Sequence, residues 1–425
     1  MGLGGGTFIT QNKILPGAYA NTVSAAAVSA TASDRGVAAI GLELDWGEEN
    51  KVIELVNSDF IRNSLVLFGC KSTDVGLKGL RDVFKHSRKV LVYRLNGGGE
   101  KASNTFGTAK YSGTRGNDIK IAVSADVDNA GKLVVRTYLG TSLVDAQTVA
   151  SAKELIDNDF VVFKKEAMLA ENAGEVMSGG TNGTQLSHEA FLAQMERYSF
   201  NAIGVVSSDS TVNKLYVEFG KTMRFDYGIK FSVVVYNTKA DFEGAVNVKN
   251  KPEAVYWTLG VQAGVAVNKS ALNMVYDGEF EIEADYTQAQ LEDAIRDGEF
   301  VLHKVGDELR VLADINSLTS VTDEKGEIFK SNQTVRVADQ IVTDAAAVFN
   351  NKYLGNVQND ASGRESFWGD IRNILVSLRK IRAIEDFDDS SIIVSAGTKK
   401  GSVVFYCKVT VIGTMEQLYL TCEIN

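Results

Sequence analysis

The segment Lys89-Val90-Leu91-Val92-Tyr93-Arg94-Leu95, followed by Asn96-Gly97-Gly98-Gly99, decides how this chain is organised. Its first part is rich in β-branched and aromatic side chains and predicts a buried strand. Upstream, residues 74–87 predict a helix, and the apolar run 64–69 (SLVLFG) predicts another strand. The apolar face of that helix would consist of Leu77, Leu80, Val83 and Phe84. Together the three segments predict a β-α-β unit that stops at the glycines.

A second glycine-rich stretch, Gly179-Gly180-Thr181-Asn182-Gly183, closes the region that the first one opens. Between them, residues 120–128 and 132–139 alternate apolar and polar side chains on either side of a short turn, which predicts a β-hairpin. The run 160–163 (FVVF) predicts a further strand. Flexible glycine stretches commonly bracket an inserted domain, so we expect residues 97–183 to form a β-rich insert.

The strand and helix alternation returns after the second glycine stretch. Residues 202–206 and 230–236 predict strands, and residues 211–225 predict the helix between them. Ser187 is expected to cap a helix that precedes this group. Strands that alternate with helices of this length predict a parallel sheet covered on both faces, so the fold class is a doubly wound α/β core interrupted by the β-rich insert.

The last third of the chain changes to an α+β pattern. A small-residue helix is expected at 254–267, and the Thr287-x-x-Gln290 capping box predicts the start of another. Residues 299–305 and 309–315 predict a hairpin across Gly306-Asp307. Two amphipathic helices follow at 335–349 and 366–380, and two strand-like segments at 402–412 and 418–425 end the chain.

Composition excludes several classes of function. With 44% hydrophobic and 23% charged residues in a chain of 425, the protein is expected to be globular and to contain several domains. A formal net charge of −10 argues against a nucleic-acid groove. There is no run of 18 apolar residues and no secretory pattern at the start, so we expect neither a membrane span nor export from the cytosol. Cys70, Cys407 and Cys422 are expected to be reduced thiols.

The pattern of residues gives little support for a catalytic function. His86, His188 and His303 fall on separate elements, so no metal-binding or triad spacing is present. The most enzyme-like features are the turn 69–73, which contains Cys70, and the segment 207–209, because open α/β sheets bind ligands where strands end. An α/β enzyme with the β-rich insert as a lid or specificity domain is therefore the alternative interpretation. We expect no catalytic residue, no metal and no cofactor.

Three stretches carry a resemblance to a known family. They are Pro16-Gly17-Ala18-Tyr19, the insert-opening Ser112-Gly113-Thr114-Arg115-Gly116-Asn117-Asp118-Ile119, and a C-terminal succession that begins with Leu312-Ala313-Asp314-Ile315-Asn316-Ser317-Leu318-Thr319. That succession continues with 335–341 (VRVADQI) and 353–359 (YLGNVQN). In this order the stretches resemble the contractile tail sheath proteins of Gram-positive phages, phage-like elements and related bacteriocins.

The resemblance implies a structural subunit that polymerises as stacked rings around an inner tube in a metastable extended state. Contraction of the polymer would then drive the tube through the target cell envelope. The implied partners are other copies of the chain, the tail tube protein, and the baseplate and tail terminator proteins, without direct nucleic-acid binding or membrane insertion. The implied location is a virion tail or bacteriocin particle that is assembled in the bacterial host cytoplasm.

With this resemblance we expect six regions. They are an N-terminal arm (1–27), two parts of an α/β core (28–96 and 184–250), the β-rich insert (97–183) on the outside of the polymer, a C-terminal α+β sheath domain (251–412) and a C-terminal arm (413–425).

We expect the two arms to be exchanged between subunits, each adding a strand to a sheet in a neighbour. Along 418–425 one face is apolar, which is the pattern of a strand that packs against a core. The expected arm residues are Pro16, Gly17, Tyr19, Val23, Leu418, Leu420, Cys422 and Ile424. A local hairpin of 402–412 with 418–425 is the alternative.

Exposed charges on the C-terminal helices are expected to face the tube, since such ion pairs are individually weak, screened by salt and therefore releasable. Helix-surface charges that serve no contact are the alternative. The candidates are Arg336, Asp339, Arg379, Lys380 and Arg382.

Overall fold

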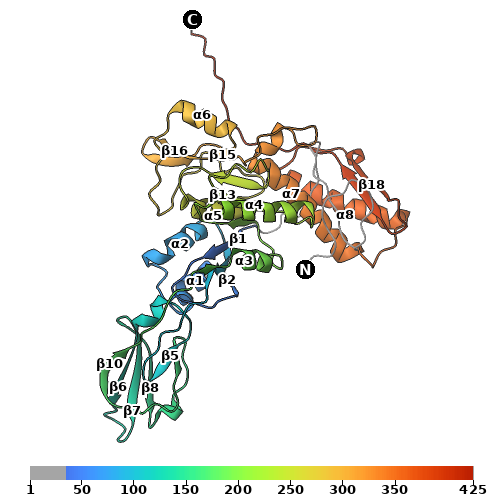
Figure 1. Ribbon diagram of the computed structural model, residues 1–425. Coiled ribbons are helices and arrows are strands. Elements are labelled where there is room, and N and C mark those ends of the chain that lie inside the picture. Colours follow the sequence, from blue (N-terminus) through green and yellow to red (C-terminus); the bar gives the residue numbers. More distant parts are fainter. Residues whose placement is uncertain (1–34, 425) are drawn as a thin grey trace. The chain divides into compact units, whose positions relative to one another are not determined.

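The computed structural model describes residues 35–424, which divide into two compact units (Figure 1). Unit 1 contains residues 35–39, Asp82–Arg88 and 196–424, and unit 2 contains Ile40–Arg81 and Lys89–Met195. Strand β1 (Val37–Leu42) and helix α2 (Lys78–Phe84) run across the division. The N-terminal arm residues Pro16, Gly17, Tyr19 and Val23 lie outside the described residues.

The first part of unit 2 differs from the sequence-based prediction. Residues 64–69 were expected to form a strand, but they end helix α1 (Asn57–Phe68). Phe60, Ser64 and Phe68 are buried at four-residue intervals, the spacing of a helix face. Gly69 then ends the helix with a left-handed φ of 68°. A short apolar run is compatible with either structure, and here the helical spacing begins upstream of it.

The strand that pairs with β3 (Lys89–Arg94) in unit 2 is β2 (Val52–Val56), which the sequence analysis did not identify. The two strands are antiparallel, with a register that runs from Val52 opposite Tyr93 to Val56 opposite Lys89. The prediction of a parallel β-α-β unit here is therefore wrong. The helix expected at 74–87 is confirmed as a short 3-10 turn, Val75–Leu77, followed by α2.

The β-rich region of unit 2 follows the predicted pattern. An antiparallel sheet has the order β10-β6-β7-β8, and the predicted hairpin is confirmed by the pairing of β6 with β7. A two-stranded sheet, β5 (Gly107–Ala109) with β9 (Val161–Phe163), shares its buried core. The bounds of the larger sheet are Ile119–Ala125 (β6), Leu133–Leu139 (β7), Ser142–Val149 (β8) and Asn172–Val176 (β10).

The chain enters and leaves this β-rich region through one short pair of strands. β4 (Asn96–Gly97) is antiparallel to β11 (Gln185–Leu186), and helix α3 (His188–Met195) follows. The 3-10 turn Thr114–Asp118 lies beside this entry, where Asn117 donates to the Gly180 carbonyl at 2.8 Å and accepts from the Gly180 N–H at 2.8 Å. Thus the 3-10 turn that follows the first glycine stretch is hydrogen-bonded to the second glycine stretch, although the two are far apart in sequence.

Unit 1 contains the predicted parallel strands. β12 (Ala202–Gly204), β13 (Ser232–Tyr236), β14 (Ala245–Val248) and β15 (Glu299–Phe300) pair in that order, and each pair is parallel. Helix α4 (Ser210–Phe225) packs on β13, and α5 (Ala254–Gly264) packs on β12, β13 and β14. Nearly all residues of α5 are buried, as expected for a helix that is apolar on all sides.

The C-terminal part of unit 1 confirms the expected helices and one of the hairpins. The capping box at Thr287 begins α6 (Gln288–Arg296), and β16 (Leu302–Val305) pairs with β17 (Glu308–Val311). The expected strand 299–305 is split, because Glu299 and Phe300 belong to the parallel sheet. Helix α7 (Asn332–Val348) continues into a π-helical turn, Phe349–Tyr353, and is followed by α8 (Ala361–Lys380).

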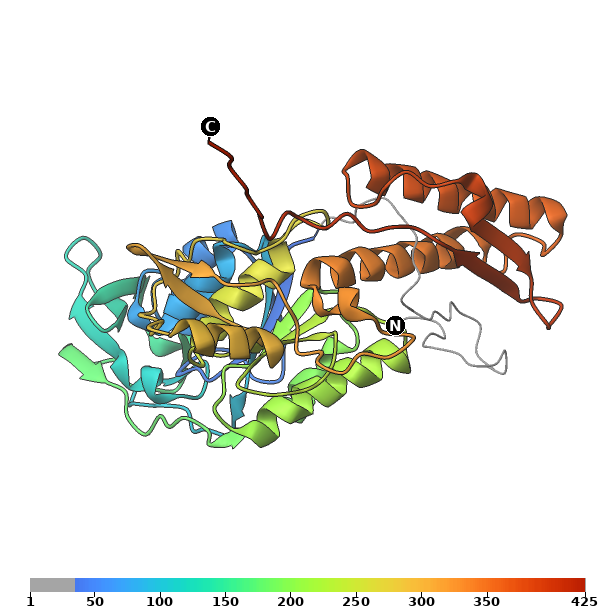
Figure 2. The same ribbon diagram turned by 90° about the horizontal axis from the view of Figure 1, so that it is seen from above.

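The last regular elements form a hairpin, β18 (Ile392–Ala396) with β19 (Val403–Cys407). α7, α8 and this hairpin enclose one hydrophobic cluster, and Figure 2 shows the two helices and the hairpin together in the orange and red part of the chain. The molecule is thus a mixed α/β protein. Within residues 35–424, no helix is long and apolar enough to cross a membrane.

We predict that Gly260→Ala destabilises the protein, although alanine is the better helix former by about 1 kcal/mol. In α5 a Cβ at position 260 would lie 2.5 Å from the Val83 carbonyl oxygen, a backbone atom that cannot easily move. The expected net loss is about 1–3 kcal/mol of unfolding free energy, measured by urea denaturation. Gly369→Ala in α8 is the matched control, because its Cβ would meet nothing within 4 Å and should leave stability unchanged or raised. Equal effects of the two substitutions would contradict the close packing of α5.

Candidate functional site

Two of the five charged residues expected to face the tube are buried inside unit 1. Arg336 is 2% exposed and Asp339 is 9% exposed, and both lie on helix α7. The expectation that they form an exposed charged edge is therefore wrong for this pair. The amphipathic pattern of α7 identified its apolar face correctly, but its polar face is covered by other parts of unit 1.

Arg336 belongs to a buried hydrogen-bonded network. Its Nη2 donates to Oδ2 of Asp314 at 2.6 Å, and its Nη1 donates to Oε1 of Gln262 in α5 at 2.9 Å. Asp314 also accepts hydrogen bonds from the Ala271 N–H and from Gln262. Burial alone would raise the pKa of Asp314, but the Arg336 charge and these hydrogen bonds outweigh burial and hold the pKa below its usual value.

Asp339 is held by a second buried pair one helical turn further along α7. Nη1 and Nη2 of Arg224 in α4 donate to its two carboxylate oxygens, each at 2.6 Å. Glu243 lies 3.9 Å from Arg224 and accepts a 2.7 Å hydrogen bond from Lys325. Bidentate arginine–carboxylate pairs fix both distance and orientation. The polar face of α7 is therefore docked on α4 and α5 in a single position.

The other three candidates lie on the surface at the end of α8. Arg379 and Lys380 occupy its last turn, and Arg382 follows with a left-handed φ of 59°. All three are exposed, and Arg379 donates to Asp386 at 3.0 Å. These side chains have the accessibility that a charged contact with another protein requires.

The two outer edges of hairpin β18–β19 are those of β18, which lies beside helix α8, and of β19. Lys408 N donates to Ser391 O and Gly397 N donates to Ser402 O, so these two residue pairs are hydrogen-bonded across the hairpin. Because hydrogen-bonded and non-hydrogen-bonded pairs alternate in an antiparallel ladder, the backbone N–H and C=O groups of every second residue between them point out of the hairpin. On the β18 side, Trp368 in α8 covers the outer edge by donating to Ile392 O at 3.0 Å. On the β19 side, the outward backbone groups of Val403 and Phe405 have no hydrogen-bond partner among residues 35–424.

The segment 413–424 leaves unit 1 as an extended thread, which both views show (Figures 1 and 2). We call it the tail. It was expected to contain a strand at 418–425, but its described residues form no strand, and the alternative hairpin with 402–412 is wrong because β19 pairs with β18. Leu418, Leu420 and Ile424 are 84%, 78% and 89% exposed, and Cys422 is exposed.

The root of the tail is anchored to α7. The side chain of Gln333, which is 3% exposed, donates to Ile412 O at 3.1 Å and accepts from Thr414 N at 3.2 Å. Beyond Thr414, the tail makes one hydrogen bond within residues 35–424, the local one from Tyr419 to Gln417. The tail therefore begins at a fixed point and continues with side chains that are largely exposed.

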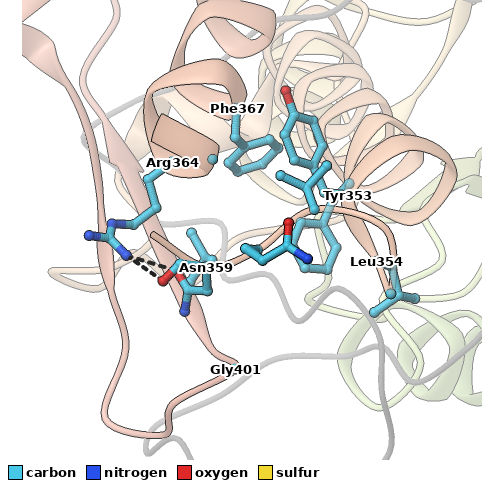
Figure 3. A pocket seen from close by; sticks show the side chains of 12 residues that line it. Tyr353, Leu354, Asn359, Arg364, Phe367 and Gly401 are labelled. Carbon is cyan, nitrogen blue, oxygen red and sulfur yellow. Dashed lines mark hydrogen bonds between the residues drawn. The ribbon is translucent and has the colours of Figure 1, made fainter. Parts of the chain in front are cut away.

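A small cavity lies at the turn end of the hairpin (Figure 3). Its volume is about 90 Å³, and its lining includes Tyr353, Phe367 and Val403. Figure 3 shows Arg364 directed at Asn359, and Nη1 of Arg364 donates to the Asn359 side chain at 2.9 Å. Asn359 in turn donates to the carbonyls of Lys400 and Ser402 at 3.1 and 2.8 Å, which ties the α7–α8 connection to the hairpin turn.

The residues considered for catalysis are poorly suited to it. Burial raises the pKa of the Cys70 thiol to about 11, which disfavours the reactive thiolate. Asp209 is the N-cap of α4 and accepts from the Thr211 N–H. His86 contacts Asp277 at 3.1 Å and packs edge-on against Trp257. Among residues 35–424, no group of three or more His, Cys, Asp and Glu side chains is placed to hold a metal ion.

Sequence reasoning missed the partners of the buried charges and the open edge. Arg224 and Asp339 are 115 residues apart, and no local pattern connects them. The Asn359 contacts with the hairpin turn likewise join segments that are distant in sequence. Only the alternation along the tail gave a usable signal, because it identified the apolar side chains that the structure leaves exposed.

Comparison with known proteins gives matches along nearly the whole described chain. Family profiles match as the tail sheath protein Gp18 domain III N-terminal region (residues 35–95), the phage tail sheath beta-sandwich domain (96–182), the phage tail sheath central domain (181–317) and the phage tail sheath C-terminal domain (324–425).

Three similar proteins illustrate the range of these matches. The crystal structure of a sheath tail protein from Desulfitobacterium hafniense is 30% identical with a TM-score of 0.83, over 95% of this chain and 99% of that one. The phage-like element PBSX protein XkdK of Bacillus subtilis is 28% identical over the full length of both chains. The anti-feeding prophage helical sheath in its contracted state is 12% identical with a TM-score of 0.54, over 99% of both chains, which shows a shared fold.

We predict that Asp314→Asn costs about 3–5 kcal/mol of unfolding free energy, since it leaves Arg336 buried without its counter-charge. Arg336→Met should cost less, because the Ala271, Gln262 and Asn332 hydrogen bonds would still hold the carboxylate. Arg296→Met, which removes only exposed pairs, is the control and should cost less than about 1 kcal/mol in urea denaturation.

The same pair predicts a pH dependence. The folded-state pKa of Asp314 lies below the unfolded value of about 3.9, so its contribution is present above that pH and is lost as the pH falls further. Asp314→Asn should remove this part of the acid dependence. The buried network would be contradicted if Asp314→Asn lowered the free energy of unfolding only as much as Arg296→Met does. It would also be contradicted if the effect of Asp314→Asn were the same at pH 7 and pH 3.

Proposed function

Because this chain belongs to the contractile tail sheath family and is a structural subunit rather than an enzyme, we propose that its copies form stacked rings around an inner tube in a metastable extended state. Contraction of this polymer drives the tube through the target cell envelope. The proposed partners are other copies of the chain, the tail tube, and the baseplate and terminator proteins. Assembly takes place in the bacterial host cytoplasm, and the finished sheath is part of a virion tail or a bacteriocin particle.

The observation that carries this proposal is the combination of an exposed apolar tail with an open strand edge. Leu418, Leu420 and Ile424 are largely exposed, while the outward backbone groups of Val403 and Phe405 in β19 have no hydrogen-bond partner within residues 35–424. An apolar segment and an unpaired edge are both aggregation hazards when they stay open. Adding the tail of one subunit to the β19 edge of the next removes both hazards and makes a head-to-tail polymer.

The side chains of the two segments also match by face. Along β19, Phe405 packs against Phe367 of α8 at a ring-centroid distance of 6.2 Å, whereas Tyr406 on the other face is 49% exposed. A tail strand beside β19 would turn its row of four apolar residues toward α8 and leave Tyr419, Thr421 and Glu423 outside. The N-terminal arm, with Pro16, Gly17, Tyr19 and Val23, is proposed to be exchanged in the same manner on the strength of the family resemblance.

The domain organisation is proposed to follow the six regions expected from the sequence, with an α/β core of 28–96 and 184–250. The β-rich insert 97–183 is proposed to lie on the outside of the polymer. Its support is a buried core formed mostly by insert residues, with Trp46 packed into it from outside the insert, and the short strand pair, β4 with β11, through which the chain enters and leaves. A domain attached in this way can occupy the periphery without interrupting the contacts of the C-terminal domain 251–412.

Arg379, Lys380 and Arg382 are proposed to face the tube. They form an exposed basic group at the end of α8, next to the acidic residues Glu385 and Asp386. Exposed ion pairs contribute about 0.2–1 kcal/mol each and are screened by salt. A contact made of many such pairs is firm when repeated along a polymer and is still broken when the polymer contracts.

Truncation of the chain after Gln417 tests the proposed function. We expect a folded monomer that does not polymerise, with an unchanged melting temperature, because Leu418, Leu420 and Ile424 are largely exposed. The measurements are sedimentation and negative-stain electron microscopy, together with thermal unfolding. Thr421→Ala, on the outer face of the tail, is the control and should polymerise normally. Sheath-like polymers from the truncated chain would refute tail exchange.

Charge reversal at Arg379 and Lys380 tests the proposed tube contact. Arg379→Glu with Lys380→Glu should abolish co-sedimentation with the cognate tube protein at low salt, while polymerisation of the subunit alone persists. The control pair Lys132→Glu with Lys153→Glu changes the net charge equally but lies in the β-rich insert. Co-assembly that keeps the wild-type salt dependence in the α8 variant would exclude these residues from the contact.

A further inference from the structure

The cavity at the turn end of hairpin β18–β19 is lined by both apolar and polar residues, and packed aromatic rings form its apolar side. The ring of Phe367 packs edge-on against Tyr353 at 5.0 Å and Phe349 at 5.7 Å. The Tyr353 hydroxyl donates to Asp370, which fixes that ring. An apolar cavity of about 150 Å³ accommodates benzene. The volume here, about 90 Å³, therefore suits the end of one branched aliphatic side chain.

The cavity is continuous with the open edge of β19. Val403 is the first residue of β19 and lines the cavity, and its outward backbone groups have no hydrogen-bond partner within residues 35–424. A strand that is added to this edge and extends to the level of Val403 would carry its inward side chain directly to the cavity mouth.

We propose that the cavity binds the side chain of Ile424 from the tail of a second copy of this chain. This inference rests on the proposed exchange of tails. The tail is the natural occupant because its apolar row is largely exposed. In addition to strand pairing, insertion of Ile424 into the cavity fixes the register in which the tail pairs with β19.

The direction of the tail follows from strand pairing. β18 and β19 are antiparallel, and sheets of one kind of pairing are favoured over mixed ones. An antiparallel tail begins near Cys407 and ends near Val403, so Ile424 reaches the cavity and Leu420 reaches the level of Cys407. Glu423 then lies close to the turn that carries Lys399 and Lys400, which adds a favourable charge contact at the same end.

Register-specific disulfide trapping tests the proposal in the full-length chain. In a Cys422→Ser background, Val403→Cys with Ile424→Cys should give ladders of linked subunits on non-reducing gels after assembly, because residues opposite each other across an antiparallel pair lie within disulfide range. Val403→Cys with Thr421→Cys is the matched control and should give none, since residue 421 faces the opposite side. Linking of Leu418→Cys in place of Ile424→Cys would overturn the proposal.

Ile424→Ala provides a second measurement that does not need cysteines. It removes three buried methyl or methylene groups at a factor of about four each, so the critical concentration for polymerisation should rise about sixty-fold. Thr421→Ala should leave it unchanged. If Ile424→Ala polymerises normally while the chain truncated after Gln417 does not polymerise, only the assignment of Ile424 to the cavity is overturned. Polymerisation of the truncated chain would instead overturn the exchange of tails.

Discussion

The buried pairing of α7 with the α/β part of unit 1 is the interaction on which the rest of the C-terminal structure depends. A helix covered on two sides is normally apolar all round, but α7 places Arg336 and Asp339 on one of its buried sides. Charges without partners at such positions would be strongly destabilising. Asp314 and Arg224 neutralise them with short hydrogen bonds, and these bonds are directional where an apolar contact is not. We infer that the pairs determine where α7 sits more than how stable the fold is.

The position of α7 in turn sets the positions of the elements proposed to assemble the polymer. Its apolar side, with Val337, Ile341 and Ala345, packs into the cluster that contains α8 and the hairpin. Its first turn holds the root of the tail through Gln333. One helix therefore connects the α/β sheet to both the donor segment and the acceptor edge. A displacement of α7 would shift the tail and the edge together and preserve their relation to each other.

Much of the fold could be predicted from the sequence, because periodicity and capping are local signals. The capping box at Thr287 and the hairpin of β6 with β7 are examples. The run 64–69 was misassigned because its four consecutive apolar residues fit a strand or a helix, and only the burial of Phe60 upstream decides between them. Arg336 and Asp339 were misplaced for a different reason. A charged helix face indicates solvent unless the partner residues are known, and here Arg224 lies 115 residues from Asp339.

The tail shows the limit of pattern reasoning in another way. The alternation of apolar and polar residues along the tail predicts a strand with one apolar face. However, residues 418–424 do not indicate which subunit supplies the rest of the sheet. The structure narrows the choice by placing α8 beside β18, where Trp368 donates to Ile392 O, whereas the outward backbone groups of Val403 and Phe405 in β19 have no hydrogen-bond partner among residues 35–424.

The two proposed kinds of contact also respond differently to movement between subunits. Main-chain pairing of the tail, together with an aliphatic side chain in a cavity, depends only on the tail and its acceptor, and the Gly413 backbone has open space in which to bend. Exposed charges at the end of α8 depend on the distance between whole subunits and the tube. Contraction would therefore preserve the first kind of contact and break the second, so neighbours stay linked while the tube is released.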